Sequence, residues 1–139
     1  MILDVRPALA DELVPCAELY ARIAADGFYW LEPEFRTAEA MLGTFNEEEV
    51  FVAVRDGALV GFVSLYRSDA FVHSLFVETR RRGVGPALLM RAIAEAGGPV
   101  TLKCADENRN ARRFYDRLGF VELDRGEEAG HSWTRLRSP

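Results

Sequence analysis

Alternating apolar and polar residues predict several β-strands along this chain. Residues 2–6 alternate in this way and are followed by Pro7, which suits a first strand. Two runs rich in β-branched and aromatic residues, 50–55 and 58–66, are separated by Asp56-Gly57, a dipeptide typical of a two-residue type I′ turn. We therefore expect a β-hairpin there. The same pattern predicts later strands over residues 70–77, 100–105, 120–123 and 131–136.

Between these strands, apolar residues recur at helical spacing and predict about four helices. The helices are expected over residues 11–25, 34 or 37 to 42, 86 to 94 or 96, and 110–118. Glycine marks helix ends, in Asp26-Gly27 after the first helix and in Gly97-Gly98-Pro99 after the third. Residues 124–130 are acidic, contain glycine and are expected to form a loop between the last two strands.

The order of these elements indicates the fold class. A helix separates the strand that ends at Val77 from the strand that ends at Ala105, so a right-handed crossover should make these strands parallel neighbours. We expect an α/β (α+β) fold with a central mixed sheet of six or seven strands. Open sheets bind ligands beyond the carboxyl ends of their strands, which directs attention to the residues after Val77 and Ala105.

Composition and charge narrow the classes of function. A chain of 139 residues, 49% hydrophobic and 28% charged, is expected to fold as a single domain over residues 1–139. The net charge of −5 disfavours nucleic acid as a partner. Cys16 and Cys104 are far apart and outside any Cys-x-x-Cys pattern, so we expect neither a disulfide nor a metal site. No stretch reads as a membrane span, and a cytoplasmic monomer or homodimer without a membrane partner is expected.

Candidate chemistry is concentrated after the strand that ends at Val77. Arg80-Arg81-Arg82 leads into Gly83 and Gly85, which precede a predicted helix. Glycines let the backbone curl with its N–H groups inward, and a helix N-terminus carries unpaired donors and partial positive charge. A phosphate or pyrophosphate is therefore the expected ligand. Taken alone, the stretch is equally consistent with a glycine turn that only begins a helix.

Two motifs in this order resemble signatures of the GNAT superfamily of N-acetyltransferases. Arg80 to Gly85 is similar to its Arg/Gln-x-x-Gly-x-Gly/Ala loop for the pyrophosphate of acyl-CoA. Residues 110–120, with Asn-Ala, Phe-Tyr and a closing Leu-Gly-Phe, resemble its second signature. The resemblance covers nearly the whole chain and is weakest over residues 26–49 and after Asp124. It implies a mostly antiparallel sheet with one splayed parallel pair, and direct acetyl transfer from acetyl-CoA (coenzyme A) to a primary amine of a small molecule or peptide.

The same resemblance implies roles in cofactor binding. The pantetheine arm is expected to lie along residues 75–77 like an extra strand, and backbone N–H groups are expected to bind the pyrophosphate, although Pro86 removes one donor. Asn110 is expected either to contact the cofactor or to cap its helix. Arg113 is expected to meet the 3′-phosphate or adenine end, or to face water. The expected cofactor-binding residues are Leu75, Phe76, Val77, Arg80, Arg81, Arg82, Gly83, Val84, Gly85, Ala87, Asn110 and Arg113.

Tyr115 stands where the family resemblance places a general acid. A phenol with a pKa near 10 is suited to protonating a leaving thiolate, but a core aromatic is the alternative. His73 and Asp69 are the candidates for the general base. Strand periodicity predicts a common face for Phe71, His73, Leu75 and Val77. On that face His73 could equally be structural, whereas Ser74, on the opposite face, could hold a water that relays the proton.

The resemblance implies that the aromatic cluster at residues 28–31 lines the acceptor pocket, although these aromatics could also be ordinary core. Carboxylates are expected around it, at Asp26, Glu32, Glu34, Asp69, Glu127 and Glu128. Such a rim would favour cationic amines, unless the charges only solubilise mobile loops. The alternative to an enzyme is a non-catalytic module that binds acyl-CoA or a nucleotide for regulation.

Overall fold

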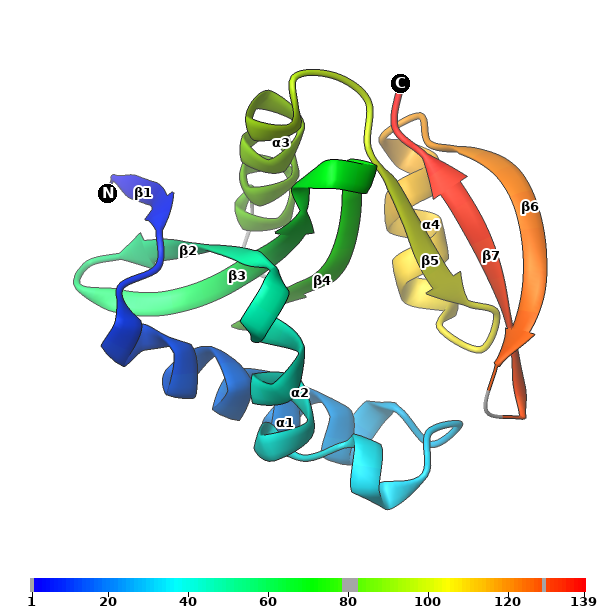
Figure 1. Ribbon diagram of the computed structural model, residues 1–139, viewed down its shortest axis with the longest axis horizontal. Coiled ribbons are helices and arrows are strands. Elements are labelled where there is room, and N and C mark those ends of the chain that lie inside the picture. Colours follow the sequence, from blue (N-terminus) through cyan, green and yellow to red (C-terminus); the bar gives the residue numbers. More distant parts are fainter. Residues whose placement is uncertain (1, 79–82, 129) are drawn as a thin grey trace.

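The fold is one mixed sheet with helices on both faces, in a computed structural model that describes residues 2–78, 83–128 and 130–139. The strand order is β1-β2-β3-β4-β5-β7-β6 (Figure 1). The strands are β1 Leu3–Pro7, β2 Glu49–Arg55, β3 Ala58–Tyr66, β4 Phe71–Val77, β5 Thr101–Ala105, β6 Val121–Glu128 and β7 His131–Arg137. The α-helices are α1 Leu13–Gly27, α2 Ala38–Thr44, α3 Val84–Ala96 and α4 Arg109–Arg117. Short 3₁₀ turns are η1 Ala10–Glu12, η2 Pro33–Phe35, η3 Phe45–Glu47 and η4 Arg67–Asp69. The predicted fold class is confirmed.

Local sequence explains where several elements begin and end. Between β2 and β3, Asp56 and Gly57 have φ angles of 54° and 77°, as a type I′ turn requires, which confirms the predicted hairpin. Thr37 caps α2, because its hydroxyl accepts the N–H of Ala40 at 3.1 Å. Gly97 ends α3 in the left-handed conformation, with a φ angle of 80°. Each position carries a residue type that its backbone geometry favours.

Each face of the sheet has its own hydrophobic core. On one face, helices α3 and α4 pack against the strands, and the buried cluster includes Leu88 and Val63. Helices α1 and α2 cover the other face (Figure 1). They contribute Leu19 and Met41 to a buried cluster that includes Phe62. The sheet is therefore fixed by burial of apolar side chains from both sides.

Strands β4 and β5 are parallel neighbours, as predicted, but they pair at one end only. Phe71 and Thr101 form the single pair in register between these two described strands, and the N–H of Thr101 donates to the carbonyl of Ala70 at 3.0 Å. Beyond this point the strands diverge toward Val77 and Ala105 (Figure 1). The divergence confirms the expected splayed pair, and it leaves the β5-facing backbone groups of β4 without partners on β5.

A bulge in β4 changes the expected direction of His73. The register against β3 shifts between residues 64 and 65, so that His73 has no directly opposed partner. Val72 and Leu75 join the core beneath α3, whereas His73 and Ser74 both contact the α2–η3 segment on the opposite face. The expectation of one face for Phe71, His73, Leu75 and Val77, with Ser74 opposite, is therefore wrong. The two-residue period of a strand holds only where no extra residue is inserted.

The C-terminal hairpin is longer than predicted. Residues 124–128 belong to β6 instead of a loop, and β6 is an edge strand whose residues are mostly exposed. Arg135 of β7 binds Asp124 through two hydrogen bonds of 2.8 and 2.5 Å. Trp133 covers Gly126 so closely that a Cβ there would lie 2.4 Å from the indole ring. Cross-strand contacts thus support a polar strand that has no alternating pattern to reveal it.

Both cysteines are buried free thiols, and burial makes them poor nucleophiles. Burial raises the pKa of Cys16 to about 12 and that of Cys104 to about 11, so both remain protonated at neutral pH.

Within the described ranges, none of the helices has the length and apolar character needed to cross a membrane.

Gly85 allows α3 to pack closely against α4. A Cβ at this position would lie 2.9 Å from Cζ of Phe114, which is too short for an undisturbed contact. We expect Gly85→Ala to lower the free energy of unfolding by about 1–3 kcal/mol, measured by chemical denaturation. Gly83→Ala should cost about 1–2 kcal/mol for a different reason, its φ angle of 77°.

The matched control is Gly43→Ala in α2, because a Cβ there meets nothing within 4 Å. This change should be neutral or stabilising. Combining Gly85→Ala with Phe114→Leu should recover part of the loss, since the obstructing ring is removed. An equal cost of Gly85→Ala in both backgrounds would contradict the packing explanation.

Candidate active site

A groove of about 760 Å³, here called the helix groove, runs between the N-terminus of α3 and helix α4. Gly83, the residue before α3, has a left-handed backbone conformation and lines the groove together with Gly85. The N–H of Ala87 donates to the carbonyl of Gly83 at 3.1 Å, which corrects the expectation that it binds pyrophosphate. Because Pro86 has no N–H, the first-turn donors that a helix leaves without an internal acceptor are those of Val84 and Gly85.

The expected cofactor-binding residues fall into different parts of the structure. Arg80, Arg81 and Arg82 lie outside the described residues. The helix groove is lined by Leu75, Val77, Gly83, Gly85, Asn110 and Arg113. The side chain of Val84 is buried in the core beneath α3, so this residue offers its backbone only. Phe76 points to the opposite face of the sheet, where its ring centroid lies 4.9 Å from that of Tyr20. Only its backbone remains a candidate for the cofactor.

Helix α4 begins at a different asparagine from the one expected. Asn108 is the N-cap, and its side-chain oxygen accepts the N–H of Ala111 at 3.3 Å. Asn110 is exposed, and its side-chain oxygen accepts a hydrogen bond of 2.5 Å from Arg113. Capping is therefore excluded as the role of Asn110, which forms a polar edge of the helix groove with Arg113. A capping asparagine after Asp106-Glu107 is the sequence signal that would have revealed Asn108.

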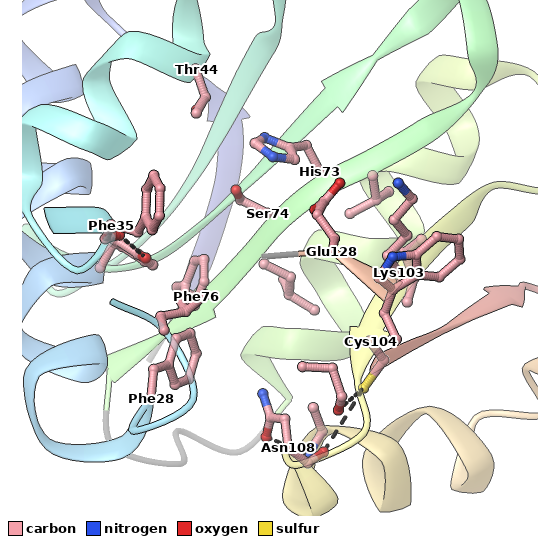
Figure 2. Close-up of a pocket in the computed structure, with 18 of the residues that line it drawn as sticks. Phe28, Phe35, Thr44, His73, Ser74, Phe76, Lys103, Cys104, Asn108 and Glu128 are labelled. Carbon is pink, nitrogen blue, oxygen red and sulfur yellow. Dashed lines mark hydrogen bonds between the residues drawn. The ribbon is translucent and has the colours of Figure 1, made fainter. Parts of the chain in front are cut away.

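A second cavity of about 490 Å³, here called the central pocket, opens between β4 and β5 on the face covered by α1 and α2 (Figure 2). Its aromatic wall consists of Tyr20, Phe28, Trp30, Phe35 and Phe76. The rings of Phe28 and Trp30 stack with centroids 4.8 Å apart. The opposite wall, from β5 and the C-terminal hairpin, consists of Lys103, Glu128, His131 and Trp133. The pocket therefore combines an apolar side with a charged side.

The helix groove and the central pocket meet beside Tyr115. Leu75, Ala111 and Tyr115 line both cavities. Tyr115 is 8% exposed, and burial raises the pKa of its phenol above the ordinary value of 10.0, with a smaller contribution from Cys104. The phenol is thus protonated at neutral pH. A protonated phenol at this junction can donate a proton to a leaving group that enters from the helix groove.

His73 lines the central pocket and is held by a carboxylate that sequence reasoning missed. Its Nδ1 lies 2.9 Å from Oε2 of Glu48, directly after η3, and the Glu48 side chain is only 12% exposed. The other carboxylate oxygen of Glu48 is buried without a hydrogen-bond partner among the described residues. This contact orients the imidazole and leaves Nε2 as the nitrogen available to a ligand. Glu48 lies in a run of three glutamates and carries no distinguishing sequence signal.

Asp69, the other candidate for the general base, does not lie in the central pocket with His73. It is exposed in η4, which precedes β4 at the end of the strand away from Val77, and it lines neither cavity. The turn is fixed instead by Arg67, which binds Glu49 and Glu95. Asp69 is therefore removed as a candidate base, because a short sequence separation from His73 does not bring it into the pocket.

The expected acidic rim is also corrected. Glu128 lines the central pocket, but the other carboxylates expected there do not: Asp26, Glu32, Glu34, Asp69 and Glu127. Lys103 lines the pocket instead, with its ammonium 4.4 Å from the centroid of the Trp133 ring. In Figure 2, Glu128 and His73 extend into the same space from opposite walls. The charged side of the pocket thus holds groups of both signs.

Comparisons with known proteins identify the family and the fold of this chain. The model of the acetyltransferase (GNAT) family matches residues 8–120. The chain is 32% identical over 150 residues to the uncharacterized N-acetyltransferase MJ1207 of Methanocaldococcus jannaschii, an alignment that covers 95% of the chain but 65% of that relative. The solution structure of apo-form YjaB from Escherichia coli is similar with a TM-score of 0.82, at 24% identity, over 99% of this chain and 98% of that one.

A second solved structure is yncA, a putative acetyltransferase from Salmonella typhimurium, determined with acetyl-CoA. It is similar with a TM-score of 0.67, at 20% identity, over 97% of this chain and 92% of that one. The two solved structures show that the fold is shared. The family match and the archaeal relative go further, because they cover most of the sequence: this chain belongs to the GNAT family of acetyltransferases.

Proposed function

We propose that the protein transfers an acetyl group from acetyl-CoA directly to a primary amine. The observation that carries this proposal is the junction of the helix groove and the central pocket at Leu75, Ala111 and Tyr115. Reaction between a thioester and an amine requires two ligands to meet at one point in a fixed orientation, and the junction provides such a point. Family membership supports an acyltransferase, and the acetyl-CoA in the Salmonella structure supports the choice of donor.

The residues of the helix groove fit acetyl-CoA. The first turn of α3 presents the N–H groups of Val84 and Gly85 for a pyrophosphate, and Arg113 adds positive charge at the groove edge. Strand β4 presents the backbone of residues 75–77 toward the splay, where the amides of a pantetheine arm can pair as an added strand does. When bound, acetyl-CoA supplies an activated acetyl carbon.

Tyr115 and His73 are the proposed acid and base. The amine nitrogen bonds to the acetyl carbon as the carbon–sulfur bond breaks. The sulfur receives the hydroxyl proton of Tyr115, and the proton released by the amine passes to Nε2 of His73, directly or through a water held by Ser74. Glu48 fixes the opposite side of the imidazole. Each proton therefore has a named donor and acceptor next to the central pocket.

A non-catalytic acyl-CoA- or nucleotide-binding module is the alternative. Such a module needs the helix groove but has no use for a second cavity that opens at the same tyrosine. Calorimetric titration with acetyl-CoA, ATP and NAD tests the nucleotide-binding version of this alternative. Tighter binding of ATP or NAD than of acetyl-CoA would support that version. Tight acetyl-CoA binding without any acetylated product from a broad amine panel would support the acyl-CoA-binding version.

The Tyr115→Phe variant tests the proposed reaction. With acetyl-CoA and a panel of amines, the wild-type protein should form acetylated amine, detected by mass spectrometry. The variant should have a kcat about 10- to 1,000-fold lower and a nearly unchanged KM for acetyl-CoA, because it loses a proton donor and almost no contact area. The raised pKa keeps the phenol protonated, so wild-type kcat should not fall between pH 7 and 10 through loss of this proton.

Arg22→Gln is the control, since Arg22 is exposed on α1 and lines neither cavity. It should behave as the wild type. Unchanged kcat for Tyr115→Phe, in a step shown to limit turnover, would assign Tyr115 to the core and remove it from the reaction.

The His73→Gln variant tests the proposed base. At neutral pH it should lower kcat/KM by at least about 100-fold, because the ammonium of the acceptor can no longer deliver its proton to an imidazole. The defect should shrink as the pH approaches the pKa of the acceptor, where the amine is already neutral. Asp69→Asn should have no effect. A defect that is constant with pH would indicate a packing role for His73.

A further inference from the structure

Lys103 is the single lysine of a chain that contains 16 arginines, and it lines the central pocket. It lies on β5, in the wall that faces the aromatic side of the pocket across the splay (Figure 2). No arginine among the described residues lines this pocket. Among the described residues that line the pocket, Lys103 is therefore the one residue that is neither arginine nor histidine and carries a cationic ammonium.

The described surroundings of Lys103 include an aromatic ring next to its ammonium but no carboxylate that accepts a hydrogen bond from it. The ammonium lies 4.4 Å from the centroid of the Trp133 ring, and an aromatic face holds a cation in place without neutralising it. The pKa of Asp124 is lowered mainly by two hydrogen bonds from Arg135. The charge of Lys103 lowers it by a smaller amount. Within the described part of the chain, Lys103 forms no salt bridge.

The remaining walls define the shape of a ligand that would use this charge. Glu128 and His73 extend into the pocket and suit the ammonium and the departing proton of an acceptor amine (Figure 2). Phe28, Trp30 and Phe35 form an apolar surface that suits a large side chain. A single ammonium balances a monoanion such as a carboxylate, whereas a phosphate site would gather several donors.

We propose that the acceptor is an amino acid with an aromatic or large apolar side chain, and that Lys103 binds its carboxylate. This inference rests on the proposed acetyl transfer and names the class of amine. It differs from the expectation of a small cationic amine or a peptide as the acceptor, because a peptide N-terminus has a neutral amide where an amino acid has a carboxylate. Lys103 is then the residue that makes the protein prefer a free amino acid over a peptide.

Three matched probes test this selection: L-phenylalanine, L-phenylalaninamide and phenethylamine. The three compounds share the aromatic ring and the amine, but only the first has a carboxylate. Lys103→Met should lower kcat/KM for L-phenylalanine by about 10- to 100-fold, the value of one charge-assisted hydrogen bond. It should leave the other two probes within a factor of about three. Comparing each variant with the wild type for the same probe removes differences in intrinsic amine reactivity.

Two further variants complete the design. Lys103→Arg keeps the charge and should retain part of the preference, while Arg22→Gln removes one exposed positive charge outside the pocket and should change nothing. An equal effect of Lys103→Met on all three probes, or no effect on L-phenylalanine, would overturn the proposal. So would peptide mapping that finds Lys103 acetylated after incubation with acetyl-CoA, because the lysine would then be an acceptor and no longer an anchor.

A binding measurement separates this inference from the proposed function. Calorimetry with N-acetyl-L-phenylalanine and its amide requires no turnover, so it tests Lys103 even if no amine is acetylated. Tighter binding of the acid, lost in Lys103→Met, supports the anchor. Equal binding of acid and amide overturns it. Absence of acetylated product from all three probes and from the wider amine panel, together with carboxylate-selective binding, would reject the proposed reaction alone.

Discussion

Strands β4 and β5 diverge after a single pair in register, and the opening between them gives the central pocket its place in the sheet. Two parallel strands that continued in register would satisfy each other's backbone groups and close the sheet. Here they pair at Phe71 and Thr101 and then separate. The cores on the two faces stabilise the sheet, because α3 and α4 bury one face and α1 and α2 the other. The unpaired backbone along β4 is thereby kept available to a ligand.

The groups that line the two cavities come from elements on both sides of this opening. The shape of the helix groove depends on the start of α3. Gly83 turns the chain there in the left-handed conformation, and Gly85, which has no Cβ, lets the ring of Phe114 of α4 pack against the helix. Three charged or basic side chains of the central pocket come from separate places: His73 from the bulge of β4, Lys103 from β5, and Glu128 from the end of β6. Among the residues that the structure describes, Tyr115 of α4 is the one that combines a titratable group with a place in both cavities.

Much of this arrangement could be predicted from the sequence, because local signals agree with the final contacts. The Asp56-Gly57 turn and the glycine stop after α3 follow from backbone conformations that few residues adopt. The features that escaped prediction depend on contacts between distant segments. The bulge at His73 follows from its register against β3, and the carboxylate that holds His73 arrives from the end of η3. The polar strand at residues 124–128 forms through pairing with β7, without an alternating pattern of its own.

If donor and acceptor meet at Tyr115, one molecule that carries both should occupy the helix groove and the central pocket together, and a bisubstrate analogue is such a molecule. The analogue joins CoA through a short acetyl linker to the nitrogen of the amine that the protein acetylates best. If the two cavities are continuous, the analogue should bind at least about 100-fold more tightly than CoA, because the second binding event becomes intramolecular. It should also compete with both substrates. Binding no tighter than that of CoA, with competition against acetyl-CoA alone, would contradict the account.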